Sequence, residues 1–142
     1  MSAIDEVMNV LDPSGKLAAA VHHRNTPENI TTLTEDEVFV FGSNDLGFHF
    51  GGAAKFAHEK FGAVWGEGEG HFGQTYALPT MGTSTELAEA VGRFLYYAAT
   101  NRDLTFLVTK IGTGIAGHPI EEIAPLFKDC APNVVLPVEF ES

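Results

Sequence analysis

Short apolar runs alternate with amphipathic stretches along most of the chain. Residues 38–41, VFVF, are apolar without interruption and rich in strand-forming side chains, which is typical of a strand buried on both faces. Further strand-like runs follow at 75–78, 104–110 and 134–136. The pattern therefore predicts a series of short strands, separated by stretches of a different periodicity.

Helical periodicity fills two of the intervals between these strands. Apolar positions in 53–61 fall mostly on one side of a helix, and Gly62 supplies a stop signal. Thr83 and Glu86 have the spacing of a capping box, and the apolar positions that follow predict an amphipathic helix that extends to about residue 99.

The remaining intervals are less regular. Residues 63–73 contain four glycines and are predicted to be irregular. Pro119 is expected to open a turn, followed by a short helix with Pro125 in its first turn, because proline in a helix interior is costly. Strands that alternate with helices favour a largely parallel sheet covered on both faces, with ligands outside the carboxyl ends of the strands.

The first part of the chain differs from the rest. Ile4, Val7, Met8 and Leu11 have helical spacing, and 12–15 reads as a turn. We therefore expect two parts, an N-terminal helical extension at 1–28 and an α/β domain at 29–142. The extension contains no chemical motif, but it could present a surface to a protein partner.

Charge and composition narrow the range of functions. The chain has 142 residues, 8 basic and 19 acidic, so its formal net charge is −11. This charge disfavours binding to nucleic-acid backbones and to anionic membranes, but not to one small anion held by backbone amides. The single cysteine excludes an internal disulfide. Neither a signal peptide nor a membrane span is recognisable, and we expect a cytoplasmic protein.

The sequence IGTGIAGHP at 111–119 is the strongest chemical motif. Three glycines within 112–117 remove side chains from a strand-to-helix turn, so that bare backbone amides can approach an anion. A phosphate or diphosphate would suit this loop; the alternative is a tight connection whose glycines serve only the turn. The predicted ligand-binding residues are Gly112, Thr113, Gly114, Ile115, Ala116 and Gly117.

A second glycine-rich loop, at 42–54, leaves the strand at 38–41. Asn44 stands at the strand end, where its amide can both donate to and accept from ribose hydroxyls. His49 is a candidate general base and Asp45 a second polar candidate, the alternatives being an inert loop histidine and a turn acid. The predicted ligand-binding residues here are Gly42, Ser43, Asn44, Gly51 and Gly52, and the predicted catalytic ones are Asn44, Asp45 and His49.

Other polar residues are weaker candidates. His118 could bind phosphate or cap the following turn, and Lys110 could neutralise a diphosphate or lie on the plain surface. His71 could belong to a mobile flap or a solvated loop, whereas His58 reads as structural. No metal-ligand spacing is present, so we expect no metal and no cofactor.

These motifs resemble the macro domain family. The resemblance covers about residues 29–138 and rests on IGTGIAGHP, and on Asn44, the glycines and alanines at 51–54, His58 and Gly62. It implies a three-layer α/β/α domain that binds ADP-ribose. The loop 112–117 would hold the diphosphate, and Asn44 would contact the distal ribose. Three features depart from the family pattern. Gly42-Ser43-Asn44 stands in place of an Asn-Ala-Asn-like stretch, Ala116 in place of a stacking aromatic residue, and Asn29 in place of an acid near adenine.

Three functions remain open at this point. The first is an ADP-ribose-type nucleotide binder, with or without activity as an ADP-ribosyl or phosphoester hydrolase. The second is a non-catalytic interaction module that has the fold without the ligand. The third, a metal-dependent phosphohydrolase, would need ligands from Asp45, His49, His71 and His118.

Overall fold

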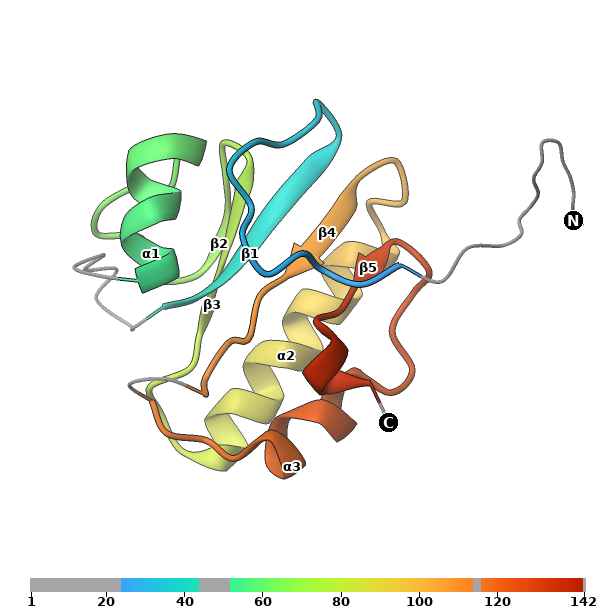
Figure 1. Cartoon of the computed structure of the whole chain (residues 1–142). Helices are drawn as coiled ribbons and strands as arrows, with labels where there is room; N and C mark the ends of the chain where they lie inside the picture. The colour runs from blue at the N-terminus through green and yellow to red at the C-terminus, as the bar shows by residue number, and fades with distance from the viewer. Residues whose placement is uncertain (1–23, 44–51, 114–115, 142) are drawn as a thin grey trace, which may run out of the picture.

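A mixed five-stranded sheet with the order β2-β3-β1-β4-β5 forms the centre of the computed structural model, which describes residues 24–43, 52–113 and 116–141 (Figure 1). The parallel strands are β1 (Glu37–Ser43), β3 (Thr75–Pro79), β4 (Thr105–Val108) and β5 (Val134–Val135), and β2 (Gly70–Phe72) is antiparallel to β3. The expected α/β class, with a largely parallel sheet, is confirmed.

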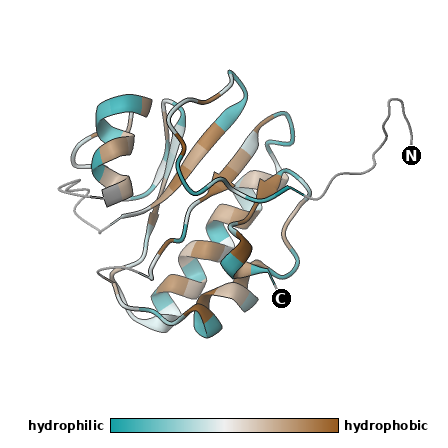
Figure 2. Ribbon diagram, in the orientation of Figure 1, coloured by the Kyte–Doolittle hydropathy of each residue, from teal (hydrophilic) through white to brown (hydrophobic). Residues whose placement is uncertain are grey.

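Residues of β1 alternate between two hydrophobic clusters on opposite faces of the sheet. Val38 and Val40 belong to the larger cluster, and Phe39 and Phe41 to the smaller one. The exposure of these four side chains is at most 4%, as expected for a central strand covered on both sides. Figure 2 shows the same apolar character along β1 and in bands on α2.

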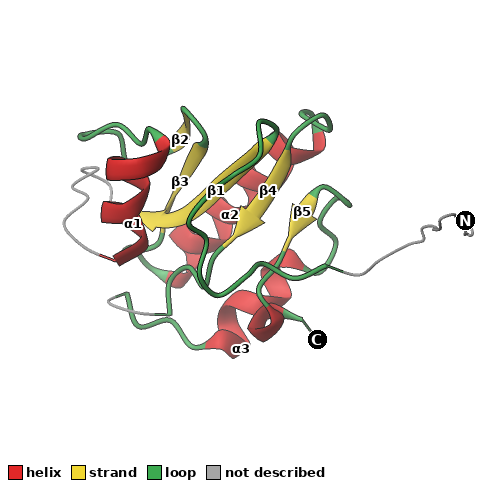
Figure 3. Ribbon diagram, turned by 45° about the horizontal axis from the view of Figure 1, so that its top comes forward, coloured by secondary structure: helices red, strands yellow, loops and turns green. Residues whose placement is uncertain are grey.

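Helices cover both faces of the sheet. Helix α1 (Gly52–Phe56) continues into the π-helical turn η1 (Ala57–Phe61) on the side of the smaller cluster, and Gly62 ends it with a φ of 92°. Helix α2 (Ser84–Ala99), opened by the predicted Thr83–Glu86 capping box, packs on the other side with α3 (Ile120–Ile123). Figures 1 and 3 show α1 separated from α2 and α3 by the sheet.

The third helical region has two parts. Helix α3 is followed directly by the 3₁₀ helix η2 (Ala124–Phe127), and another 3₁₀ turn, η3 (Val138–Phe140), follows β5. Pro125 stands in the first turn of η2, as predicted, where its missing N–H leaves no hydrogen bond unmade. The helical turn before Pro125, which begins at Ile120, was not expected from the sequence.

The stretch 63–73 is not irregular throughout, because β2 forms a hairpin with β3. Phe72 pairs with Thr75, whose Oγ1 donates to the Phe72 carbonyl over 2.6 Å. Only Gly73 and Gln74 connect the two strands, and Gly73 has a φ of 59°, which glycine adopts without steric cost. The glycine signals a turn, but the strand before it is too short for its pattern to be recognised.

Residues 24–28, assigned above to the extension, lie against the sheet. Asn25 forms a parallel bridge with Leu136, and Thr26 donates its N–H to the Leu136 carbonyl (2.9 Å) and its hydroxyl to the Val135 carbonyl (3.0 Å). The body of the domain therefore includes residues 24–28. The predicted helical part of the extension, at 1–21, falls outside the described residues.

No helix in the described part of the chain has the length and apolar character needed to cross a bilayer. The cytoplasmic location stays a prediction. Cys130 is a free, partly buried thiol just after η2, and burial raises its pKa. It thus packs as a small apolar side chain near a helix end.

Phe94 of α2 tests the larger core cluster. Its ring is fully buried, and it packs against aromatic rings from β3, β4 and η2. The distances between ring centroids are 4.9 Å to Tyr76, 5.5 Å to Phe106 and 6.4 Å to Phe127. We predict that Phe94→Ala lowers the free energy of unfolding by about 3–5 kcal/mol, because it leaves a cavity where these elements meet. Urea denaturation measures the loss.

Tyr96, on the same helix, provides the control. Its side chain is 74% exposed, so Tyr96→Ala should change the free energy of unfolding by no more than about 0.5 kcal/mol. Equal effects of the two substitutions would contradict the position of the core described above.

Candidate functional site

The segments that follow β1, β3 and β4 meet at one edge of the sheet. A Cβ atom at Gly42 would lie 3.1 Å from Thr80 Oγ1 and 3.5 Å from the Gly112 nitrogen. The Thr80 N–H also donates to the Ser43 carbonyl over 2.9 Å. The two predicted glycine-rich loops therefore start side by side, as the parallel order of their strands requires.

The turn at Gly112 requires glycine for two reasons. Its φ is 75°, and a Cβ atom there would lie 3.0 Å from Ile123 Cδ1 and 3.4 Å from His118 Cδ2. The first condition disfavours any side chain, and the second means that Ile123 would have to shift to make room for one. The bare backbone of Gly112 thus lies between α3 and the end of β1.

Two threonine hydroxyls fix the chain around this turn. Thr109 Oγ1 donates to the Val40 carbonyl over 2.8 Å and ties the end of β4 to β1. Thr113 Oγ1 donates to the Lys110 carbonyl over 2.9 Å. Thr113 is one of the predicted ligand-binding residues, but its hydroxyl proton is used within the loop, which leaves backbone amides as donors to a ligand.

His118 closes the loop on its other side. Its backbone N–H donates to the Gly112 carbonyl over 2.8 Å. In its ring, Nε2 lies 2.8 Å from the Thr80 carbonyl oxygen and Nδ1 lies 3.0 Å from Glu122 Oε1. Both ring nitrogens are occupied by protein acceptors, so the alternative in which His118 binds phosphate directly is not supported.

Glu122 extends this network to α2. Ser84, the first residue of α2, donates its hydroxyl to Glu122 Oε2. The hydrogen bond from Ser84, and then the one from His118, lower the pKa of the Glu122 carboxyl below its ordinary value. We refer to His118, Glu122, Ser84 and Thr80 together as the His118 network.

A cavity of about 330 Å³ lies beside the loop that follows β4. Its walls come from four parts of the chain: the segment at 26–30, β1 with the start of α1, the end of β4 with its loop, and η3. The lining residues are Thr26, Pro27, Glu28, Ile30, Phe39, Ala53, Thr109, Lys110, Thr113, Pro137, Val138 and Glu139.

The charges at the mouth of this cavity are paired. Lys110 Nζ lies 3.2 Å from Glu28 Oε2 and 3.7 Å from Glu139 Oε2. The hydrogen bond to Glu28 is the main cause that raises the pKa of Lys110. The lysine considered for diphosphate neutralisation therefore already has two carboxylate partners.

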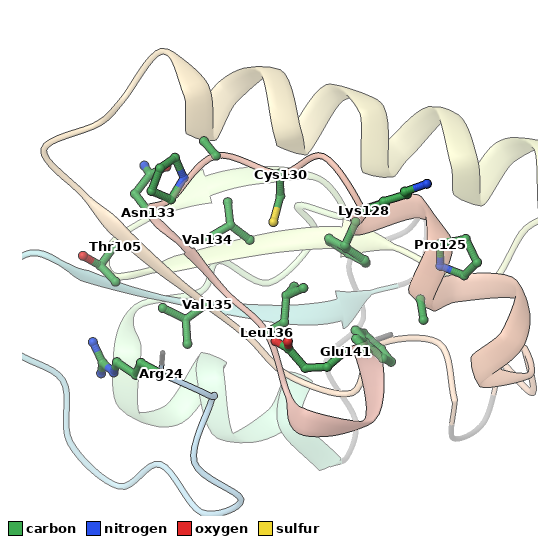
Figure 4. A pocket seen from close by; sticks show the side chains of 15 residues that line it. Arg24, Thr105, Pro125, Lys128, Cys130, Asn133, Val134, Val135, Leu136 and Glu141 are labelled. Atoms are coloured by element: carbon green, nitrogen blue, oxygen red, sulfur yellow. The ribbon is translucent and has the colours of Figure 1, made fainter. Parts of the chain in front are cut away.

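A larger, open groove of about 760 Å³ runs along β5 and contains none of the predicted site residues (Figure 4). Val134, Leu136 and Cys130 line it, together with Arg24 and Lys128 at its rim. Because the groove has no residue in common with the cavity beside β4, it is a separate feature of the molecule.

The structure describes only part of the predicted site. It places Gly42, Ser43, Gly112 and Thr113 together, with Gly52 at the start of α1 and Ala116 and Gly117 between Thr113 and His118. The other predicted residues fall outside the described part of the chain and stay predictions: Asn44, Asp45, His49, Gly51, Gly114 and Ile115.

Two further histidines serve the fold. His71 Nδ1 lies 2.6 Å from Tyr97 Oη, which fixes β2 to α2, so His71 does not belong to a mobile flap. His58 Nδ1 lies 2.9 Å from the Ala63 carbonyl, in agreement with its predicted structural role. In the described ranges, no three metal-ligating side chains come together.

The sequence did not single out Thr80, Ser84 and Glu122. The spacing of His118 and Glu122, four residues apart, is a recognisable local signal. Thr80 and Ser84 have no such signal, because only the fold brings them to His118.

Comparison with known proteins assigns neither a family nor a function to the chain. No family model matches it, and neither a curated protein nor a solved structure is significantly similar. The resemblance to macro domains therefore rests on the motifs quoted above, and the function has to be argued from the site.

Gly112 and Gly117 form a matched pair for a test of the loop. Their φ values are 75° and 73°, but a Cβ atom at Gly117 would meet no atom of the described residues within 4 Å. Gly117→Ala should cost about 1–2 kcal/mol of stability from the backbone conformation alone. Gly112→Ala should cost at least about 1 kcal/mol more, because the new methyl also displaces Ile123. Urea denaturation compares the two variants, and equal losses would contradict the close packing at Gly112.

Glu122 provides a test by pH. A carboxyl whose pKa is lowered by folding stabilises the folded protein at pH values above the pKa of the unfolded chain, which is 4.5 here. This stabilisation is lost as the pH falls through the lower pKa of the folded state. Below pH 4.5 we therefore expect the melting temperature of the wild type to fall more steeply than that of Glu122→Gln. Glu121→Gln, which changes an exposed neighbour, should keep the steep fall. A steep fall in all three proteins would remove Glu122 as its cause.

Proposed function

We propose that the chain binds ADP-ribose or a related nucleotide diphosphate between its two glycine-rich loops. The observation that supports this most directly is the proximity of Gly42, at the end of β1, to Gly112 in the loop after β4: a Cβ atom placed on Gly42 would lie 3.5 Å from the Gly112 nitrogen. Because the loops leave the same edge of a parallel sheet, their amides can face one anion.

Main-chain donors carry the recognition of the diphosphate in this proposal. Gly112 has no side chain of its own to cover its amide, whereas Lys110 already has carboxylate partners. Neutral amides suit a protein with a net charge of −11, because they bind one anion locally without a basic surface.

The cavity beside Thr113 would hold the nucleoside. Its volume, about 330 Å³, is at the lower end of the range for small-molecule sites. Ile30, Phe39 and Ala53 supply apolar walls, and Glu28 and Glu139 supply oxygens that can accept hydrogen bonds from an amine or a hydroxyl. Glu28 and Ile30 flank Asn29, the position that the macro domain resemblance places near the base.

The same resemblance extends to the architecture and the chemistry. We propose a three-layer, macro-like α/β/α arrangement, which the helices on both faces of the sheet support. A hydrolase that acts on an ADP-ribosyl linkage or ester would use Asn44 to hold the ribose, with Asp45 and His49 as further participants. Asn44→Ala should then abolish turnover of an ADP-ribosylated substrate, and an unchanged rate would leave a binding protein only.

One observation favours the alternative, a non-catalytic interaction module with the same fold. Two carboxylates, of Glu28 and Glu139, stand at the mouth of the cavity, and Ala116 provides no aromatic face for a base. This alternative predicts no thermal stabilisation by any nucleotide.

Calorimetry with ADP-ribose tests the proposal, and Ala53→Phe shows where the ligand binds. Ala53 is exposed in the first turn of α1 and lines the cavity, so a phenylalanine there fills the space without disturbing the core. We expect the wild type to bind and Ala53→Phe to lose at least about tenfold in affinity, which corresponds to ~1.4 kcal/mol.

Ala99→Phe is the matched control, since Ala99 is also an exposed helical alanine but lies at the end of α2. It should bind as the wild type does. Absence of heat at millimolar ligand, with the protein folded, would contradict the proposal, and equal affinities of all three proteins would exclude the cavity as the site.

A further inference from the structure

The ring of His118 is held between two acceptors. One is the Thr80 carbonyl, 2.8 Å from Nε2, and the other is the Glu122 carboxylate, 3.0 Å from Nδ1. A neutral imidazole has one N–H and one lone pair, so it can donate to only one of them. While Glu122 is ionised, both hydrogen bonds exist together only when the ring carries two protons.

The same residue holds the turn of the proposed anion-binding loop. The N–H of His118 donates to the Gly112 carbonyl, and its ring carbon Cδ2 lies against Gly112. The side chain of His118 is only 11% exposed, so water cannot readily replace a lost hydrogen bond. Movement of this ring therefore displaces the backbone of Gly112 or the end of β3.

We propose that His118 is a pH-dependent positioning residue, which in its doubly protonated form holds the Gly112 turn in the shape that binds the diphosphate. When the ring loses one proton, a lone pair faces either the Thr80 carbonyl or the Glu122 carboxylate. Two acceptors in contact repel each other, and the ring can no longer join both. The effect on ligand binding rests on the function proposed above.

The charged groups around His118 agree with this inference. Glu122 on α3 faces the ring, and its carboxylate is also held by Ser84 of α2. Glu86 on α2 is directed to the Thr83 backbone, as part of the capping box, and Glu121 on α3 is exposed. Because the Glu122 carboxylate stays ionised at neutral pH, it can only accept a hydrogen bond, and Nδ1 must carry a proton to donate one.

The sign of the effect follows from this geometry. Affinity for the diphosphate should be highest where the His118 ring is doubly protonated, and should fall at higher pH, where the ring has lost one proton. Loss of one charge-assisted hydrogen bond corresponds to about tenfold in affinity. The diphosphate of ADP-ribose does not titrate between pH 5.5 and 8.5, so the ligand itself adds no pH dependence.

NMR spectroscopy tests the inference without any ligand. The ring nitrogens of His118 and the amide of Gly112 are followed from pH 5.5 to 8.5 in the full chain. We expect the Gly112 amide to shift with the same midpoint as the ring. A Gly112 amide that stays constant while the ring titrates would overturn the inference.

Calorimetry over the same pH range measures the affinity for ADP-ribose of the wild type and of three variants. Glu122→Gln should bind with no dependence on pH, because a glutamine can donate to the lone pair on Nδ1 and still accept from Ser84. His118→Gln should also lose the pH dependence. His58→Gln, which removes a histidine near the Ala63 carbonyl, should keep it.

Each result separates the two proposals. A pH dependence that survives in both Glu122→Gln and His118→Gln overturns the role of His118. If no protein binds ADP-ribose at any pH, but the Gly112 amide still follows the His118 ring, the proposed function fails and the positioning role stands.

Discussion

The parallel pairing of β1 with both β3 and β4 is the constraint on which the site depends. The register joins Ser43 to Pro79 and Val40 to Val108, so all three strands end at one edge of the sheet. The loops that follow them are far apart in the sequence, yet Gly42, Thr80 and Gly112 come within contact distance. Glycine suits both loop starts, because a Cβ atom at Gly42 would crowd the Thr80 side chain and Gly112 has a positive φ.

The two faces of the sheet contribute differently to this edge. The larger cluster, on the side of α2 and α3, joins helices to strands through aromatic contacts such as that of Phe94 with Tyr76. It fixes the positions of Thr80 and Ile123, against which the Gly112 turn packs. The smaller cluster, on the side of α1, contains Phe39, which also lines the cavity beside β4. The site thus lies between the larger and the smaller hydrophobic cluster.

Local sequence patterns predicted those structural features that depend on residues close together in the chain. The apolar run of β1, the Thr83 capping box and the stop at Gly62 depend on neighbours within a few residues, and all three were found. The two glycine-rich loops were recognised by composition, and the alternation of strands and helices correctly placed their starts together.

Features with distant partners could not be predicted in this way. Asn25 donates to the Leu136 carbonyl across 111 positions, and nothing near Asn25 indicates a bridge to the sheet. The His118 network joins two stretches that are far apart in the sequence, Thr80 to Ser84 and His118 to Glu122. The roles of Asn44, Asp45 and His49 remain sequence-based predictions, because these residues lie outside the described structure.

In the proposed function, the loops after β1 and β4 border one shared binding site. A titration of the ¹⁵N-labelled chain with ADP-ribose, followed by amide chemical shifts, tests this arrangement. We expect the amides of Gly42 and Gly112 to shift together with one dissociation constant, while that of Gly92, exposed on α2, stays constant. Shifts at only one of the two loops, or at neither in the folded protein, would contradict it.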